Sequence, residues 1–290
     1  MTGLSRSRAT EAGRSRAAGL RAAVRGAALA AVMGTALAAA SCRSGPPAAG
    51  SDPCRTFLCD HDGIIRGGTA ARRLSLIFTG GSFADGGEVI RRTLREEGVK
   101  AAFFFTGDFY RTPEFDGTIR GLIADGHYLG AHSDKHLLYC PWEDREKTLV
   151  GRDEFRADIE ANFREMARFG IRRENARFFI PPYEWYNRDI AAWARGMGLA
   201  LFNFTPGTSS NADYTTPSMP EYLPSQTIYD RILAYEEKDP RGLNGFLLLV
   251  HIGTDPERTD KFYLRLGDLI RELEKRGYEF VRIDELLRLE

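Results

Sequence analysis

Residues 126–139 read Gly-His-Tyr-Leu-Gly-Ala-His-Ser-Asp-Lys-His-Leu-Leu-Tyr, a short apolar run followed by a polar loop. The loop contains His132 and His136, two of the five histidines in the chain. Two imidazoles at this spacing can converge on one metal, in a helical turn or in a tight loop after a strand, and neutral imidazole suits zinc, cobalt, nickel or iron. We therefore expect a strand over residues 128–131 that ends at a divalent-metal site. The alternative is a solvated loop whose histidines cap neighbouring carbonyl groups.

Apolar strands and amphipathic helices alternate on both sides of this stretch. The expected strands are residues 73–78, 101–106, 128–131, 177–180, 199–204, 246–252 and 278–283. The expected helices are residues 87–98, 113–125, 154–169, 188–197, 228–235 and 260–276. This alternation predicts an α/β domain with a parallel sheet, open or closed into a barrel. In either form, functional residues gather where the strands end, at their carboxyl ends.

Composition narrows the class of protein. The chain has 290 residues, with 40 basic and 40 acidic side chains and a formal net charge of zero. Nothing in this balance indicates a nucleic-acid-binding surface. The length that follows the N-terminal region suffices for one domain with a large core.

The first 42 residues predict an export signal. A basic region with six arginines precedes an apolar run at 27–40, which is too short to span a bilayer. Ala39-Ala40-Ser41-Cys42 resembles the cleavage site of bacterial lipoproteins, so we expect an exported, periplasmic or cell-surface protein that contacts the membrane only through lipid on Cys42. Ordinary secretion is the alternative. Residues 43–60 are then a tether and residues 61–290 the domain, and Cys54 and Cys59 could form a disulfide or remain free thiols.

Three motifs at strand ends resemble those of one family. They are His132-Ser133-Asp134-Lys135-His136, Pro181-Pro182-Tyr183 and Leu247-Leu248-Leu249-Val250-His251. Over about residues 73–285 the chain resembles the polysaccharide deacetylases, the NodB homology domain of carbohydrate esterase family 4. The resemblance implies a distorted (β/α)7 barrel and a metal-dependent hydrolase that removes N- or O-acetyl groups from an acetylated polysaccharide or a peptidoglycan-like glycan.

The resemblance also implies roles for individual residues. His132 and His136 match the metal ligands, and zinc is the expected ion. The Tyr183 backbone N–H matches the oxyanion donor. His251 matches the general acid that protonates the leaving group, and Asp255 could orient its imidazole and raise its pKa.

The chain departs from the family where the family has its general base. The family motif Thr-Phe-Asp-Asp-Gly corresponds here to residues 77–81, Ile-Phe-Thr-Gly-Gly, so both carboxylates are missing. The arginine that orients the base is replaced by Ile180. The Asp-rich fourth motif has no clear match in residues 204–213. A hydrolase still needs a base, and the carboxylates that could serve are Asp85, Asp134 and Glu184. Asp85 could also supply the missing metal ligand.

Three functions therefore compete. The first is a variant deacetylase that has recruited another carboxylate. The second is a glycan-binding domain without catalysis, in which Trp185 and neighbouring aromatic residues stack on sugar faces. The third is a glycoside hydrolase that pairs Glu184 with Asp85 or Asp134. The histidines favour the first function, because a binding module has no evident use for them.

Overall fold

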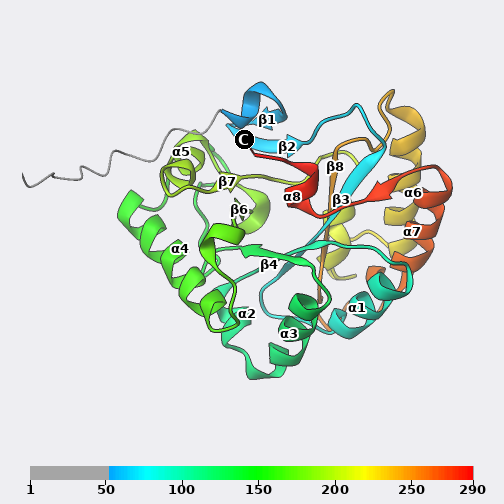
Figure 1. The fold of residues 1–290 in the computed structure, drawn as a ribbon, viewed down its shortest axis with the longest axis horizontal. Coiled ribbons are helices and arrows are strands. Elements are labelled where there is room, and N and C mark those ends of the chain that lie inside the picture. The colour runs from blue at the N-terminus through cyan, green and yellow to red at the C-terminus, as the bar shows by residue number, and fades with distance from the viewer. Residues whose placement is uncertain (1–51, 290) are drawn as a thin grey trace, which may run out of the picture. The chain divides into compact units, whose positions relative to one another are not determined.

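The structure is a computed structural model that describes residues 52–289 (Figure 1). These described residues all belong to one compact unit. The predicted export signal, with Cys42, lies outside the described residues. Within the described part of the chain, no helix is both long and apolar enough to cross a bilayer.

The centre of the domain is a sheet of seven parallel strands, as the sequence predicts. The strands are β3 (Arg73–Gly80), β4 (Ala102–Phe105), β5 (Tyr128–Ala131), β6 (Phe178–Phe179), β7 (Ala200–Leu201), β8 (Phe246–His251) and β9 (Glu279–Phe280). They are ordered β7-β6-β5-β4-β3-β8, and β9 pairs with the start of β3. Most strand residues are buried on both faces, which is typical of a parallel sheet covered by helices.

Helices follow one another around the outside of the curled sheet (Figure 1). They are α1 (Gly87–Glu96), α2 (Gly107–Arg111), α3 (Asp116–Ala124), α4 (Arg152–Ala167), α5 (Arg188–Gly196), α6 (Ser225–Lys238) and α7 (Leu266–Lys275), whereas the short α8 (Ile283–Leu286) packs against the core inside the curl. Strand side chains alternate between two cores. Phe78 and Phe103 belong to the core that contains the helix side chains, whereas Ile77 and Phe104 belong to the core inside the curl.

The curl is completed without a regular ladder between β7 and β8. Residues 202–205 leave β7 and cross to β8, where the Thr205 N–H donates to the Leu247 carbonyl at 3.0 Å. On the way, Phe202 forms a parallel bridge with Ile64 of β2 (Gly63–Arg66). The architecture is therefore the distorted α/β barrel that was expected, with one irregular seam.

The folded unit begins before the predicted boundary at residue 61. The segment 52–60 contains a short 3-10 helix, Pro53–Arg55, and the strand β1 (Leu58–Asp60), which pairs antiparallel with β2. A disulfide joins Cys54 to Cys59, with the Cα atoms 5.6 Å apart. This part of the predicted tether is therefore structured, because the disulfide closes the segment into a loop and the β1–β2 pairing holds it to the domain.

His127 lies just before β5 and is buried as a neutral base. Its Nδ1 accepts a hydrogen bond from the Ala101 N–H at 3.2 Å. Because Nδ1 is the acceptor, the proton of the neutral ring is on Nε2. Burial, helped by the charge of Lys100, lowers the pKa of His127 to about 4. The unfolded chain takes up this proton near pH 6.5, so stability is lost as the pH falls from 6.5 towards 4.

We expect this one group to reduce the free energy of unfolding by about 2.5 kcal/mol between pH 7 and pH 4.5. His127→Phe removes the titration, so its loss of stability over that range should be smaller by about the same amount. Urea unfolding of both proteins at the two pH values measures the difference. His61→Phe, at a partly exposed histidine, is the matched control. Equal losses in the wild type and in His127→Phe would contradict the assignment.

Candidate functional site

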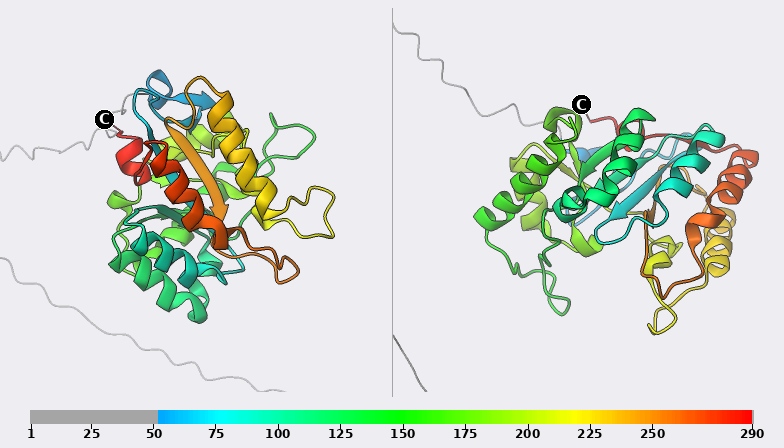
Figure 2. Two further views of the ribbon diagram at one scale, coloured as in Figure 1. Left: turned by 90° about the vertical axis from the view of Figure 1, so that its right-hand side faces the viewer. Right: turned by 90° about the horizontal axis from the view of Figure 1, so that it is seen from below.

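The long loops of the domain extend from one side of the sheet. The loops after β5, after β7 and after β8 project in the same direction in both views of Figure 2, where they are green, yellow and orange. These loops follow the carboxyl ends of their strands, where α/β folds place their sites. The residues singled out by the sequence at 132–136, 183–185 and 251 lie on this side.

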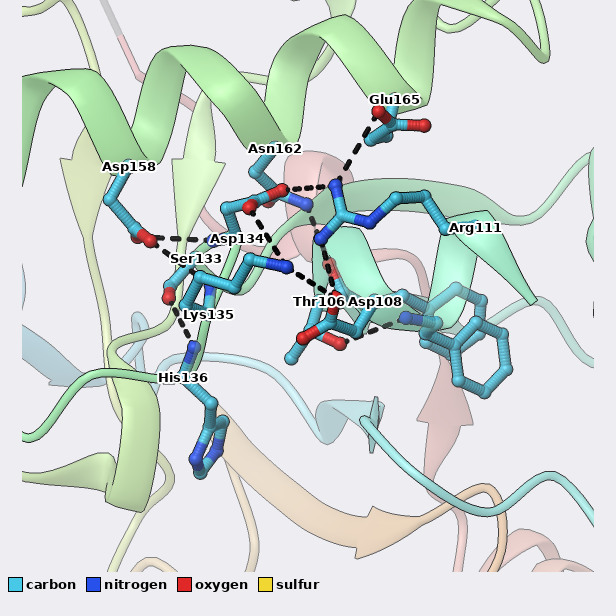
Figure 3. Close-up of polar contacts among 12 residues, drawn as sticks. Thr106, Asp108, Arg111, Ser133, Asp134, Lys135, His136, Asp158, Asn162 and Glu165 are labelled. Atoms are coloured by element: carbon cyan, nitrogen blue, oxygen red, sulfur yellow. Dashed lines mark hydrogen bonds and ion pairs between the residues drawn. The ribbon is translucent and has the colours of Figure 1, made fainter. Parts of the chain in front are cut away.

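Helix α4 holds the backbone of the histidine loop (Figure 3). Asn162 Oδ1 accepts from the His132 N–H at 3.0 Å, and the Asn162 amide donates to the Phe105 carbonyl at 3.1 Å. One turn earlier, the Asp158 carboxylate accepts from the N–H groups of Asp134 and Lys135, both at 3.0 Å. These bonds satisfy the loop amides where the chain turns away from β5, so the loop is fixed by side chains of a rigid helix.

The two histidines meet edge to face, with ring centroids 5.0 Å apart. His132 donates from Nδ1 to the Ile180 carbonyl at 2.9 Å, which leaves Nε2 as a free lone pair. Burial and the neighbouring His136 keep the pKa of His132 well below 6.5. Burial also lowers the pKa of His136 to about 4. Both rings are therefore neutral near pH 7, which is the form that binds metal.

The end of β3 cannot complete this pair with a carboxylate. Gly80 occupies the position of one missing Asp, and a Cβ there would lie 2.7 Å from Ile252 Cγ2, 2.9 Å from Phe105 and 3.0 Å from Phe109. Apolar side chains thus fill the space that a carboxylate would need. Among the described residues, no three His, Cys, Asp or Glu side chains are grouped to hold a metal. The candidate ligands that the structure brings together here are the imidazoles of His132 and His136.

His251 ends β8 and is held by Asp213, a residue that the sequence did not identify. The Asp213 carboxylate accepts from His251 Nδ1 at 2.7 Å and from the His251 backbone N–H at 2.8 Å. Burial acts to lower the pKa of His251, but the charge and hydrogen bond of Asp213, together with the charge of Glu184, outweigh it and raise the pKa. Because Nδ1 is bonded to Asp213, Nε2 is the nitrogen available to carry a transferable proton.

Glu184 interacts electrostatically with both His251 and Asp213. Burial raises the pKa of the Glu184 carboxyl to about 7, Asp213 adds to the rise, and His251 opposes it. The residue has a φ of 52°, in the left-handed region that disfavours a side chain with a Cβ. The family usually has Gly at this position. A strained Glu where Gly would be relaxed is a feature that occurs mainly at functional sites.

Tyr183 also has a left-handed backbone, with a φ of 57°. No acceptor among the described residues is bonded to its N–H, as an oxyanion donor requires. Its ring is exposed and lies edge-on to His136, at 4.4 Å, and to Trp142, at 5.7 Å. Trp185 is only partly exposed. Its Nε1–H donates to the Pro141 carbonyl, and Arg145 stacks on its ring. Trp142 and Tyr183 are therefore the exposed aromatic rings beside His136, and Tyr214 is an exposed ring beside His251.

Two acidic candidates are engaged elsewhere in the structure. Asp85 accepts from the Thr254 N–H at 2.8 Å and from the Tyr263 hydroxyl at 2.8 Å, and it pairs with Lys261 at 2.9 Å. Both of its oxygens fix the loop after β8, so the structure gives no support to Asp85 as base or metal ligand. Asp134 is buried and paired with Arg111 at 2.7 Å (Figure 3).

The expected role of Asp255 requires correction. Its carboxylate accepts from the Glu257 backbone N–H at 2.8 Å, which stabilises the turn after β8. Asp213 instead orients His251, although it precedes it by 38 residues. Asp255 is near His251 in the sequence, and the expected role was based on that proximity. Asp213 takes this position because the loop after β7 folds back over β8.

The family is shown by comparison with known proteins. Residues 66–202 match the family model described as polysaccharide deacetylase. This domain belongs to the polysaccharide deacetylase family. The match includes the histidine loop and the Pro181-Pro182-Tyr183 motif.

Two curated proteins and one solved structure are similar to this polysaccharide deacetylase domain. The peptidoglycan-N-acetylglucosamine deacetylase PgdA of Listeria monocytogenes is 24% identical over 215 residues, which are 74% of this chain and 39% of that protein. The glycolipid 2-alpha-mannosyltransferase 1 of Candida albicans is 26% identical over 165 residues, 53% of this chain and 38% of that protein. The chain thus spans less than half the length of these curated relatives.

The solved structure is BA3943 of Bacillus anthracis, described as a pseudoenzyme of carbohydrate esterase family 4. It has a TM-score of 0.61 and 18% identity, and the alignment covers 79% of this chain and 70% of that one. At this identity the likeness shows the fold alone, and it agrees with the curled parallel sheet described above.

Proposed function

We propose that the domain is a metal-assisted deacetylase of a glycan, in which Glu184 replaces the missing base of β3. The observation that carries the proposal is the electrostatic interaction of Glu184 with His251 and Asp213, at the carboxyl ends of the strands. The pKa of Glu184 is near 7 and the pKa of His251 is raised. A carboxylate and an imidazolium in these states are suited to act as base and acid near neutral pH.

The chemistry assigned to the residues is hydrolysis of an acetamide or an acetyl ester. Glu184 takes a proton from the attacking water, whose oxygen bonds to the acyl carbon. The Tyr183 N–H donates to the developing oxyanion. His251 Nε2 then gives its proton to the leaving nitrogen or oxygen as the bond to the acyl carbon breaks, and acetate is released. Asp213 stabilises the charged imidazole and fixes its orientation.

His132 and His136 are the residues that would hold a divalent metal, with zinc as the expected ion. Such an ion would supply positive charge beside the reacting acyl group. With two protein ligands, binding should be weaker than at a three-ligand site.

We expect titration of the metal-free protein with zinc to show one site, which is lost in the variant His132→Ala/His136→Ala. Isothermal titration calorimetry measures the affinity and the stoichiometry. His61→Ala, which removes a histidine bonded to Asp60, is the matched control and should bind as the wild type does. A site that survives the double substitution would place the metal elsewhere.

The proposal itself is tested by incubating the purified domain and zinc with an acetylated chitooligosaccharide or with acetylated xylan, and by measuring released acetate. Turnover by the wild type that disappears with chelator supports a metal-assisted deacetylase. Binding of the oligosaccharide without acetate release would support the second function, a glycan-binding domain. The apolar filling around Gly80 and the exposed rings of Trp142 and Tyr183 favour that second function.

A further inference from the structure

A cavity lies at the opposite end of the strands from the proposed deacetylase site. It has a volume of about 630 Å³ and is open to solvent. Its walls come from the start of β5, the segment 170–178 before and within β6, and the C-terminal segment 282–289. These are the amino ends of the strands, so the sheet separates this cavity from the histidine loop.

The cavity is rich in arginine. Four arginines and two acidic residues line it: Arg172, Arg177, Arg282, Arg288, Glu174 and Asp284. Glu174 pairs with Arg172 at 3.3 Å, and Asp284 accepts two hydrogen bonds from Arg282. Arg177 and Arg288 are exposed and form no ion pair with any residue from 52 to 289. Within the described residues, the cavity therefore has two guanidinium groups without an ion-pair partner.

The cavity wall also contains a hydrogen-bond donor without an acceptor. His127 lines the cavity and is 6% exposed, and its Nε2 has no partner within the described part of the chain. Since Nδ1 accepts from the Ala101 N–H, Nε2 carries the proton. A buried donor without a partner costs about 1–3 kcal/mol. An oxyanion in the cavity that reached this N–H would offset the cost.

The other lining residues include the apolar side chains of Ile123, Leu129 and Phe178. We propose that this cavity binds a phosphate ester, with its oxyanion on Arg177 and Arg288 and its organic part against these apolar side chains. Guanidinium groups pair with phosphate through two parallel N–H donors. The phosphate could belong to a free sugar phosphate or to a phosphodiester in an envelope polymer.

Calorimetric titration of the full chain at low salt tests the proposal. Glucose 6-phosphate should bind saturably and glucose should not, and the affinity should fall as salt is added. In the double variant Arg177→Gln/Arg288→Gln, which changes two exposed positions, the affinity for glucose 6-phosphate should be lower by about tenfold or more. Arg92→Gln, at an exposed arginine of α1 that is remote from the cavity, is the matched control and should not change it.

A glycerol phosphodiester oligomer distinguishes the two sources. Tighter binding of the oligomer than of glucose 6-phosphate would identify a polymer as the ligand, and the reverse order would identify a free monoester. The proposal is overturned if neither phosphate ester binds the wild type, or if the double variant binds as well as Arg92→Gln. Because the titration needs no deacetylase activity, failure of the proposed function would leave this result unaffected.

Discussion

Glu184→Gln should lower deacetylase turnover by about 10²- to 10⁴-fold, because the amide cannot accept a proton from water. Its shape is nearly that of Glu, so oligosaccharide binding and zinc affinity should stay close to the wild-type values. The measurement is the rate of acetate release at saturating oligosaccharide, with zinc titration as the control. A Glu184→Gln variant with wild-type turnover would remove Glu184 from the mechanism.

A second substitution separates the catalytic role from a structural one. Glu184→Gly introduces the residue that the family usually has and relieves the backbone strain at a φ of 52°. We expect the variant to gain about 1 kcal/mol in free energy of unfolding and to be as inactive as Glu184→Gln. If Glu184 were retained for structural reasons alone, Glu184→Gly would be less stable than the wild type.

The sequence predicted the elements that depend on local pattern. Apolar runs such as residues 246–252 and 101–106 define strands whose residues are buried on both faces, and their alternation with helices leaves few topologies other than a parallel sheet. The histidine spacing at 132 and 136 was equally local, and the structure brings the two rings together.

The sequence could not predict which carboxylate reaches His251. Asp213 lies in a polar loop that contains no periodic pattern, and its position depends on how residues 202–224 fold over β8. A signal was available, since this loop follows the strand end where the family has its fourth motif. Asp255 and Asp85 are near strand ends in the sequence, and this position alone made them candidates. Their hydrogen bonds to Glu257, Thr254 and Tyr263 depend on tertiary contacts or turn geometry that the sequence pattern does not encode.

The pH dependence of the reaction should report the coupled pair of Glu184 and His251. The base must be deprotonated, so activity should rise as the pH increases through about 7, the raised pKa of Glu184. The acid must be protonated, so activity should fall as the pH increases beyond the raised pKa of His251. The two limbs give apparent pKa values that belong to the pair, because each charge shifts the other. In Glu184→Gln the rising limb should disappear.

Substitutions at His251 and at Asp213 should affect the part of the pH profile where activity falls as the pH increases. His251→Gln should lower turnover by about 10²- to 10⁴-fold with the zinc affinity unchanged, since His132 and His136 remain. Asp213→Asn keeps the volume but removes the charge that raises the pKa of His251, so the falling limb should move to lower pH and the maximum rate should decrease. A profile of kcat/KM against pH for the three proteins measures both effects. Among the described residues, Asp213 is the only carboxylate that is hydrogen-bonded to His251, so the pKa of His251 must change when Asp213 loses its charge. If the fall in activity at high pH occurs at the same pH in Asp213→Asn as in the wild type, another group is the acid.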